Sequence, residues 1–324
     1  MEENTEQRLD LTLFSEKIQE LKERIASVVV GQEQTVDLVL TAILANGHVL
    51  IEGVPGVAKT LLARLTARLI DADFSRVQFT PDLMPSDVLG TTVFNMKTNG
   101  FDFHQGPIFA DIVLVDEINR APAKTQAALF EVMEERQVSI DGTTHRMGEL
   151  YTILATQNPV EQEGTYKLPE AQLDRFLMKI TMDYPSLEEE VNILERHHTN
   201  AALVKLEDVT PVLTKEELLS LRALMSRVFV DRTLLQYIAL IVQQTRTSKA
   251  VYLGASPRAS VAMLQSSKAY ALLQGRDFVT PEDIKFVAPY VLQHRLILTA
   301  EAEMEGYSPV KVTQRLIDKV EVPK

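Results

Sequence analysis

Residues 52–65, "EGVPGVAKTLLARL", decide the fold, because they nearly complete a phosphate-binding loop. The pattern of such a loop is G-x-x-x-x-G-K-[ST], and Ala58 stands at the position of its second glycine. An apolar run precedes the loop and a helical pattern follows it, so backbone N–H groups at the helix N-terminus could hold phosphates. Lys59 would then reach the β- and γ-phosphates, and Thr60 would ligate Mg²⁺. Alanine is tolerable at position 58 if its φ is negative; the alternative is a strand-to-helix turn that precedes a lysine by chance.

A second motif, "DIVLVDE" at residues 111–117, supports the nucleotide interpretation. Its apolar run predicts a buried strand, and this strand ends on two carboxylates, Asp116 and Glu117. A carboxylate at the edge of a sheet suits Mg²⁺–ATP, with Asp116 on the ion. Glu117 would then lie close enough to polarise an attacking water. Taken alone, the pair could equally cap the following helix, but Lys59 and Thr60 upstream weaken that alternative.

The composition is that of a soluble globular protein, with 45% hydrophobic and 24% charged residues in a chain of 324, long enough for two domains. A net charge of −12 argues against binding nucleic acid through bulk charge. The absence of cysteine excludes disulfides, a thiol nucleophile and Cys-ligated zinc. The first ten residues are unlike a signal peptide, and the apolar runs are too short to cross a bilayer. We therefore expect no membrane segment and a cytoplasmic location.

The periodicity of the apolar residues changes twice along the chain. Helical spacing at residues 14–25 predicts a leading amphipathic helix. Strand-like apolar runs then follow at residues 48–53, 75–80, 111–117 and 151–157. Asp141-Gly142 predicts a hairpin turn, and helix-start signals recur beyond residue 185. The expected organisation is a helical segment over residues 1–28, an α/β domain over 29–185 and a helical domain over 186–324.

Three further polar residues stand where a ligand could be bound. Asn158 follows the last of these strands, at the edge where open α/β sheets bind ligands, although Asn-Pro is also a turn signal. Arg175 could be functional or could form a local ion pair with Asp174. Arg258 lies in the first turn of a predicted helix capped by Ser256, where a cation opposes the helix dipole by about 0.3–1 kcal/mol. That cost is explicable if the arginine faces a phosphate. The six histidines have no metal-ligand spacing and are interpreted as structural or surface residues.

Taken together, these motifs resemble the MoxR family of AAA+ ATPases. The resemblance spans residues 29 to 260, most of the chain, and its long central stretches are far more specific than a phosphate-binding loop alone. The stretches that carry it are "VVGQ" (29–32), "EGVPGVAKT" (52–60), "QFTPDLMPSDVLG" (78–90), "DEINRAPAKTQAALFEVMEE" (116–135), "ATQNPVEQEGTYKLPEAQLDRF" (155–176) and "GASPRAS" (254–260). Alanine at the position of Ala58 is the form that this family commonly shows.

The resemblance implies an α/β fold, an AAA+ P-loop domain with a five-stranded parallel sheet, followed by an all-α lid domain. It implies that Asn158 positions water together with Glu117. Arg175 would be an arginine finger that reaches a neighbour's nucleotide, and Arg258 a lid sensor that acts on its own or a neighbour's nucleotide. The implied nucleotide contacts are Gly31, Gly53, Val54, Pro55, Gly56, Val57, Ala58, Lys59, Thr60 and Leu61. Residues 91–106 would form an insert within the second helix, and residues 137–147 the hairpin before the sensor strand.

The family also implies function: a homo-oligomeric ring, usually hexameric, that uses ATP and Mg²⁺ to remodel a protein client, often with a von Willebrand factor A domain partner. Both the insert and the hairpin would face the pore or a substrate. A DNA-associated AAA+ motor is the alternative, but Lys97 and Arg146 are the only firm cations of the insert and the hairpin. A nucleotide-dependent binding module is a third interpretation, which Glu117, Asn158 and Arg175 disfavour because a pure binder does not need them.

Overall fold

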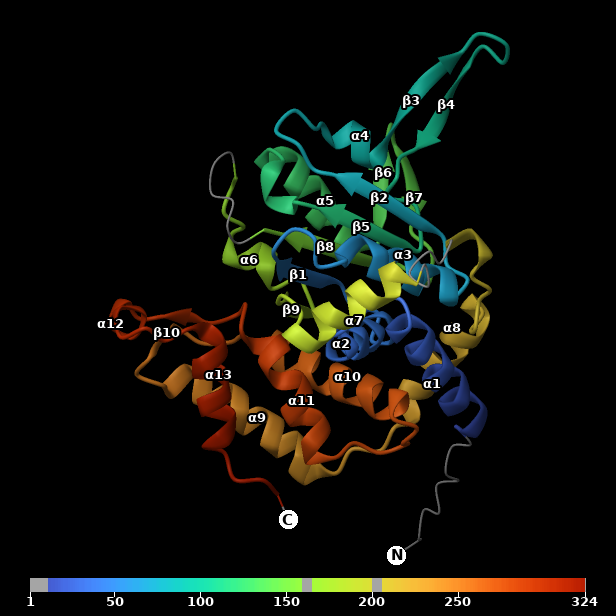
Figure 1. Ribbon diagram of the computed structural model, residues 1–324. Coiled ribbons are helices and arrows are strands. Elements are labelled where there is room, and N and C mark those ends of the chain that lie inside the picture. The colour runs from blue at the N-terminus through green and yellow to red at the C-terminus, as the bar shows by residue number, and fades with distance from the viewer. Residues whose placement is uncertain (1–10, 159–164, 200–205, 324) are drawn as a thin grey trace, which may run out of the picture.

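The computed structural model describes residues 11–158, 165–199 and 206–323 (Figure 1). Residues 1–10 of the expected N-terminal segment, and residues 159–164 within one of the stretches that carry the resemblance, lie outside the described part. A five-stranded parallel sheet occupies the centre of the α/β part, in the order β2–β5–β8–β1–β9. Its strands are β1 (Val49–Gly53), β2 (Phe74–Gln78), β5 (Ile112–Asp116), β8 (Thr152–Gln157) and β9 (Met178–Met182).

Strand β9 is the one that the apolar runs did not predict; the fifth strand was expected only from the resemblance. Its sequence alternates, with Lys179 and Thr181 between buried residues. An edge strand needs only one fully buried face, so it lacks the continuous apolar run of an inner strand.

Alternate residues of the inner strands pack on opposite faces of the sheet, as strand geometry requires. On one face, Val49 and Ile51 join a core with α2 (Glu33–Leu44) and α3 (Lys59–Leu69). On the other face, Leu50 joins a second core with α5 (Ala123–Glu135). Because both faces are covered, the inner strands are apolar along their whole length.

Two antiparallel hairpins extend from the α/β part. The first, β3 (Gly90–Asn95) and β4 (Gly100–Gln105), follows the short helix α4 (Pro85–Leu89) and projects at the top of Figure 1. The second joins β6 (Gln137–Ile140) to β7 (Thr143–Arg146). Its turn residues Asp141 and Gly142 have φ values of 49° and 79°, as a type I′ turn requires. The hairpins lie where the insert and the pre-sensor hairpin were expected.

The helical lid lies at the opposite end of the molecule from the first hairpin (Figure 1). Helix α10 (Pro257–Leu273) packs against α2, and α11 (Pro281–Leu292) packs against β9, so the lid shares a core with one face of the sheet. A short antiparallel ribbon, β10–β11, accompanies the expected helices. The remaining elements are α1 (Thr12–Ala26), α6 (Glu170–Leu173), α7 (Leu187–His198), α8 (Lys215–Leu224), α9 (Arg232–Thr247), β10 (Val251–Leu253), α10 (Pro257–Leu273), α11 (Pro281–Leu292), β11 (Ile297–Leu298), α12 (Ala300–Met304) and α13 (Pro309–Asp318).

None of the helices in the described part of the chain is both long and apolar enough to span a bilayer.

Candidate nucleotide site

The loop between β1 and α3 has the open backbone of a phosphate cradle. Gly56 has a φ of 89°, and a Cβ added there would meet no atom within 4 Å. Ala58 also has a positive φ, 62°, in the left-handed region. The expectation that alanine is tolerated through a negative φ is therefore wrong. The loop imposes the left-handed conformation, at a cost of roughly 1–2 kcal/mol for a residue with a Cβ.

The first turn of α3 offers donors for an anion. No side chain caps this helix at Ala58, so its first N–H groups are available to phosphate oxygens. The Lys59 ammonium donates to the carbonyl of Gly53 at 2.5 Å, which places it across the loop. Burial lowers the pKa of Lys59, and the nearby carboxylates of Asp116 and Glu117 oppose that change. The structure therefore brings the predicted lysine and both predicted carboxylates together.

The order of the strands explains this convergence. Strand β8 lies between β1 and β5, and all three are parallel, so Gly53, Asp116 and Asn158 reach the same edge of the sheet. Asn158 directly follows β8 and is buried. This is the carboxyl edge, where ligands bind in open α/β sheets.

Thr156, near the end of β8, contacts both Asp116, the last residue of β5, and Glu117, which follows it. Its hydroxyl donates to Asp116 Oδ1 at 3.0 Å and accepts the backbone N–H of Glu117 at 3.0 Å. Glu117 has a φ of 55°, an uncommon conformation for a residue with a long side chain. Thr156 thus holds the side chain of Asp116, the proposed metal ligand, and the strained backbone of Glu117.

Both carboxylates also contact arginines. Arg76 of β2 donates to Asp116 Oδ2 at 2.6 Å, and Arg120 lies 3.0 Å from Glu117 Oε2. Arg120 and Glu117 are both partly exposed, so their contact can break at small cost, on the order of 1 kcal/mol or less. Asp116 is buried, so the loss of Arg76 costs more unless another cation takes its place.

The side chains fit a nucleotide with Mg²⁺. Carboxylate and hydroxyl oxygens, the donors of Asp116 and Thr60, suit a hard cation, and the uncapped helix and the open loop suit phosphates.

Gly31 lies against helix α7. Its φ is 71°, and a Cβ added there would lie 2.5 Å from Glu189 Cδ. Glu189 is held in place, because its carboxylate accepts the N–H of Ser186 at 2.6 Å in the predicted capping box. The positive φ favours glycine here, and a Cβ would displace the Glu189 carboxylate from its capping box.

Arg175 and Arg258 meet at a single carboxylate. Arg175 Nη1 lies 2.9 Å from Glu134 Oε2, and Arg258 Nη2 lies 2.8 Å from Glu134 Oε1. The alternative of a local ion pair between Arg175 and Asp174 is wrong, since Asp174 pairs with Arg295.

This arginine pair lies at the edge of the sheet opposite to Lys59. The N–H of Leu177, two residues after Arg175, donates to the carbonyl of His48, which precedes β1. The loop that holds Lys59 begins at the other end of this five-residue strand, roughly 16 Å away along its axis. The structure therefore brings Lys59, Asp116, Glu117 and Asn158 together and leaves both arginines apart from them.

The sequence patterns did not indicate Thr156, Arg76 or Glu134 as site residues. Thr156 had a usable signal, because it is a polar residue near the end of an otherwise apolar strand, two positions before Asn158 and therefore on the same face. Nothing in the local sequence of Arg76 or Glu134 points to a partner 40 or more positions away.

Comparison with known proteins identifies the family. A family model described as "ATPase family associated with various cellular activities (AAA)" matches residues 48–178, and an AAA lid domain model matches residues 243–318. The chain is 48% identical to YeaC of Bacillus subtilis over 93% of each protein. It is 44% identical to Chaperone MoxR1 of Mycobacterium tuberculosis, covering 93% of this chain and 81% of that one. A crystal structure of a Cytophaga hutchinsonii protein, 41% identical, superposes with a TM-score of 0.89 over 97% of each chain. The chain belongs to the MoxR family of AAA+ ATPases.

Proposed function

We propose that this protein hydrolyses ATP at the Lys59 edge of the sheet, within a homo-oligomeric ring that is most simply a hexamer. The observation that carries the proposal is that the charged groups lie at two opposite edges of the sheet. The phosphate loop and two carboxylates share one edge, while Arg175 and Arg258 lie together at the other. Such a division suits a site that is completed by a neighbouring subunit.

Within one subunit, the side chains divide the work of binding and proton transfer. Lys59 and the N–H groups of α3 hold the phosphates, and Thr60 and Asp116 hold Mg²⁺. When bound, Mg²⁺ would supply charge neutralisation for the phosphates. Glu117, once Arg120 has released it, takes a proton from the attacking water, which Asn158 helps to orient.

The two arginines act on the nucleotide of the neighbouring subunit. Arg175 cannot reach its own phosphate loop, because the length of β1 separates them. Arg258 shares Glu134 with Arg175, so we assign it to the same neighbour rather than to its own nucleotide. In the free subunit both cations pair with the single carboxylate of Glu134, and in the ring the γ-phosphate competes for them.

A protein client suits the β3–β4 hairpin better than DNA does. The hairpin exposes four large apolar side chains, those of Val93, Phe94, Met96 and Phe101, beside polar ones. Met96 is 89% and Phe101 73% exposed, and Phe94 stacks edge-on against Phe101. A single lysine, Lys97, is the only cation that a phosphate backbone would meet on this hairpin. Chaperone MoxR1, among the relatives, carries a chaperone name. We therefore propose chaperone-like remodelling in the cytoplasm, with a von Willebrand factor A domain protein as partner, over a DNA-associated motor.

A mixing experiment tests the shared site. Lys59→Ala and Arg175→Ala should each be nearly inactive alone, Arg175→Ala by at most about 10³-fold. In mixed rings, some interfaces pair an intact Lys59 pocket with an intact Arg175, so part of the ATPase activity should return.

The matched control mixes Lys59→Ala with Glu117→Gln. Both changes damage the same pocket of their own subunit, so no interface is complete and activity should stay low. If mass measurement shows mixed rings of Lys59→Ala and Arg175→Ala that remain inactive, the shared site is wrong.

A further inference from the structure

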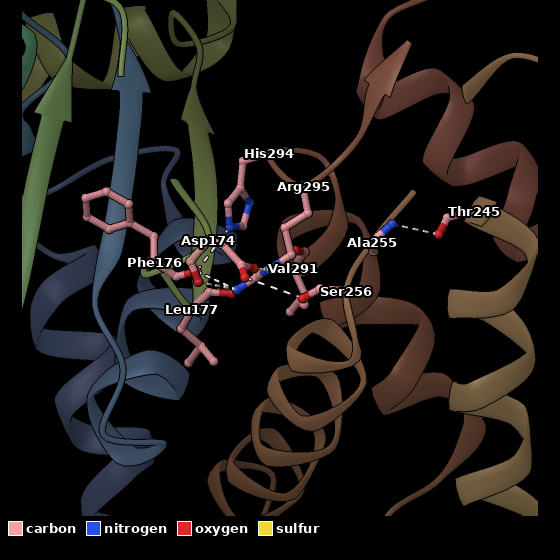
Figure 2. Close-up of polar contacts among 9 residues, drawn as sticks. All are labelled: Asp174, Phe176, Leu177, Thr245, Ala255, Ser256, Val291, His294 and Arg295. Atoms are coloured by element: carbon pink, nitrogen blue, oxygen red, sulfur yellow. Dashed lines mark hydrogen bonds and ion pairs between the residues drawn. The ribbon is translucent and has the colours of Figure 1, made fainter. Parts of the chain in front are cut away.

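A buried arginine of the lid forms hydrogen bonds with the residues on both sides of Arg175. The side chain of Arg295, in the loop after α11, is 4% exposed and points toward Asp174 and Phe176 in Figure 2. Its Nε donates to Asp174 Oδ1 at 2.7 Å, and its Nη2 donates to the carbonyl of Phe176 at 2.7 Å. The other acceptors of its N–H groups are the carbonyls of Asp174, Leu177 and Val291. These contacts use all five donors of the guanidinium.

The carbonyls on both sides of Arg175 are therefore tied to the lid. His294 adds a second bond, since its Nε2 lies 3.1 Å from the carbonyl of Phe176 and must donate to it. Burial, together with the adjacent Arg295 cation, holds the pKa of His294 well below its usual value, so the ring stays neutral. A lysine in place of Arg295 could not reproduce this planar set of donors.

Asp174 extends the same connection to the turn before Arg258. Ser256 occupies the N-cap position of α10 but does not cap the helix; its hydroxyl donates to Asp174 Oδ2 at 3.4 Å. The N–H of Ala255 donates to Thr245 Oγ1 of α9 at 3.0 Å (Figure 2). The turn is thus held by α9 on one side and by Asp174 on the other.

We propose that Arg295 and Asp174 are positioning residues that set the locations of Arg175 and Arg258 for the neighbouring subunit's nucleotide. This inference rests on the proposed function of those two arginines. The side chains of Arg175 and Arg258 are more exposed than that of Arg295 and share Glu134, so they can exchange Glu134 for a phosphate. Their backbones meanwhile stay fixed through Arg295 and Asp174. The lid and the arginine finger then move as one unit.

The test uses Arg295→Lys and, as a milder change, Asp174→Asn in the full chain. Each variant should bind ATP with wild-type affinity, because its own phosphate loop is untouched. Each should lose kcat, by up to about 100-fold, since a displacement of about 1 Å at a reacting group can cost that much. Arg276→Lys is the matched control, because Arg276 pairs with Asp283 inside the lid and should keep a near-normal kcat.

Mixed rings show whether Arg295→Lys damages its own nucleotide pocket or the arginines that it supplies to the neighbouring subunit. Arg295→Lys should regain activity with Lys59→Ala subunits, which still supply a well-placed Arg175, and should gain none with Arg175→Ala subunits. If Arg295→Lys does not fold, Asp174→Asn must give this pattern. A normal kcat in Asp174→Asn, or no recovery with Lys59→Ala where Arg175→Ala recovers, overturns the inference while the shared site stands. If Arg175→Ala itself gains nothing from Lys59→Ala, the shared site fails and the inference falls with it.

Discussion

At the scale of single residues, the candidate site depends on a hydroxyl that connects two strands. Thr156 bonds to both Asp116 and the backbone of Glu117, so it orients two groups with different proposed roles. Thr156→Val keeps the shape of the side chain and removes both hydrogen bonds. We expect kcat to fall roughly 10- to 100-fold, the usual cost of removing a group that orients a metal ligand. ATPase assays over a range of Mg²⁺ concentrations measure this loss.

Thr156→Ser is the control, because it keeps the hydroxyl and should recover most of the activity. If the Thr156→Val variant has a wild-type kcat and Mg²⁺ dependence, Asp116 and Glu117 hold their positions without the Thr156 hydroxyl.

At the scale of elements, the contact between α7 and the loop after α1 depends on a glycine. Gly31→Ala should destabilise the protein by roughly 1–2 kcal/mol through its positive φ. An additional loss should come from moving Glu189 out of its capping box. Gly306→Ala separates the two effects, because Gly306 has a φ of 80° but open space around it. Denaturant unfolding should therefore show a larger loss for Gly31→Ala than for Gly306→Ala.

A double-mutant cycle with Glu189→Ala tests the cause of that difference. In the Glu189→Ala background, the cost of Gly31→Ala should approach that of Gly306→Ala. An unchanged cost would mean that α7 is not the obstacle.

At the scale of the whole molecule, the neutral imidazoles of His48 and His294 connect parts of the fold that are distant in sequence. His48 donates Nε2–H to Met133 of α5 and accepts the N–H of Ile153 at Nδ1, and His294 joins the lid to Phe176. Burial is the main reason that the pKa of His48 falls to about 3, with Arg136 contributing; the pKa of His294 is also lowered, chiefly by burial. In the unfolded chain both rings bind protons near pH 6.5.

The folded state therefore binds fewer protons than the unfolded state below about pH 6.5, and stability must fall as pH decreases through that range. For His48 this loss continues down to about pH 3 and amounts to about 1.4 kcal/mol per pH unit. Calorimetry should show Tm falling between about pH 7 and pH 5 in the wild type, and falling less steeply in His48→Gln. His197→Gln, on the exposed surface of α7, should keep the wild-type slope. Equal slopes in all three proteins would contradict neutral burial of His48.

The sequence by itself determined the features that depend on neighbouring residues: the phosphate loop, four of the five strands, the hairpin turn at Asp141-Gly142 and the starts of α7, α8 and α11. These are set by periodicity, turn chemistry and capping, which act over a few positions. The sequence was misleading at Ala58, where the loop rather than the residue's own preference decided a positive φ. It was also misleading at Ser256, which bonds to Asp174 instead of capping its helix.

Only the tertiary structure decided which charges meet. Glu134 with Arg258, and Asp174 with Arg295, lie more than 100 positions apart in the chain. Their contacts follow from the strand order and from the packing of α11 on β9, which no local pattern specifies. Asp174 illustrates the difference, since the nearest cation in sequence was Arg175. Burial of Arg295 instead required a carboxylate beside it, because an unpaired charge in the interior is far more costly than an exposed one.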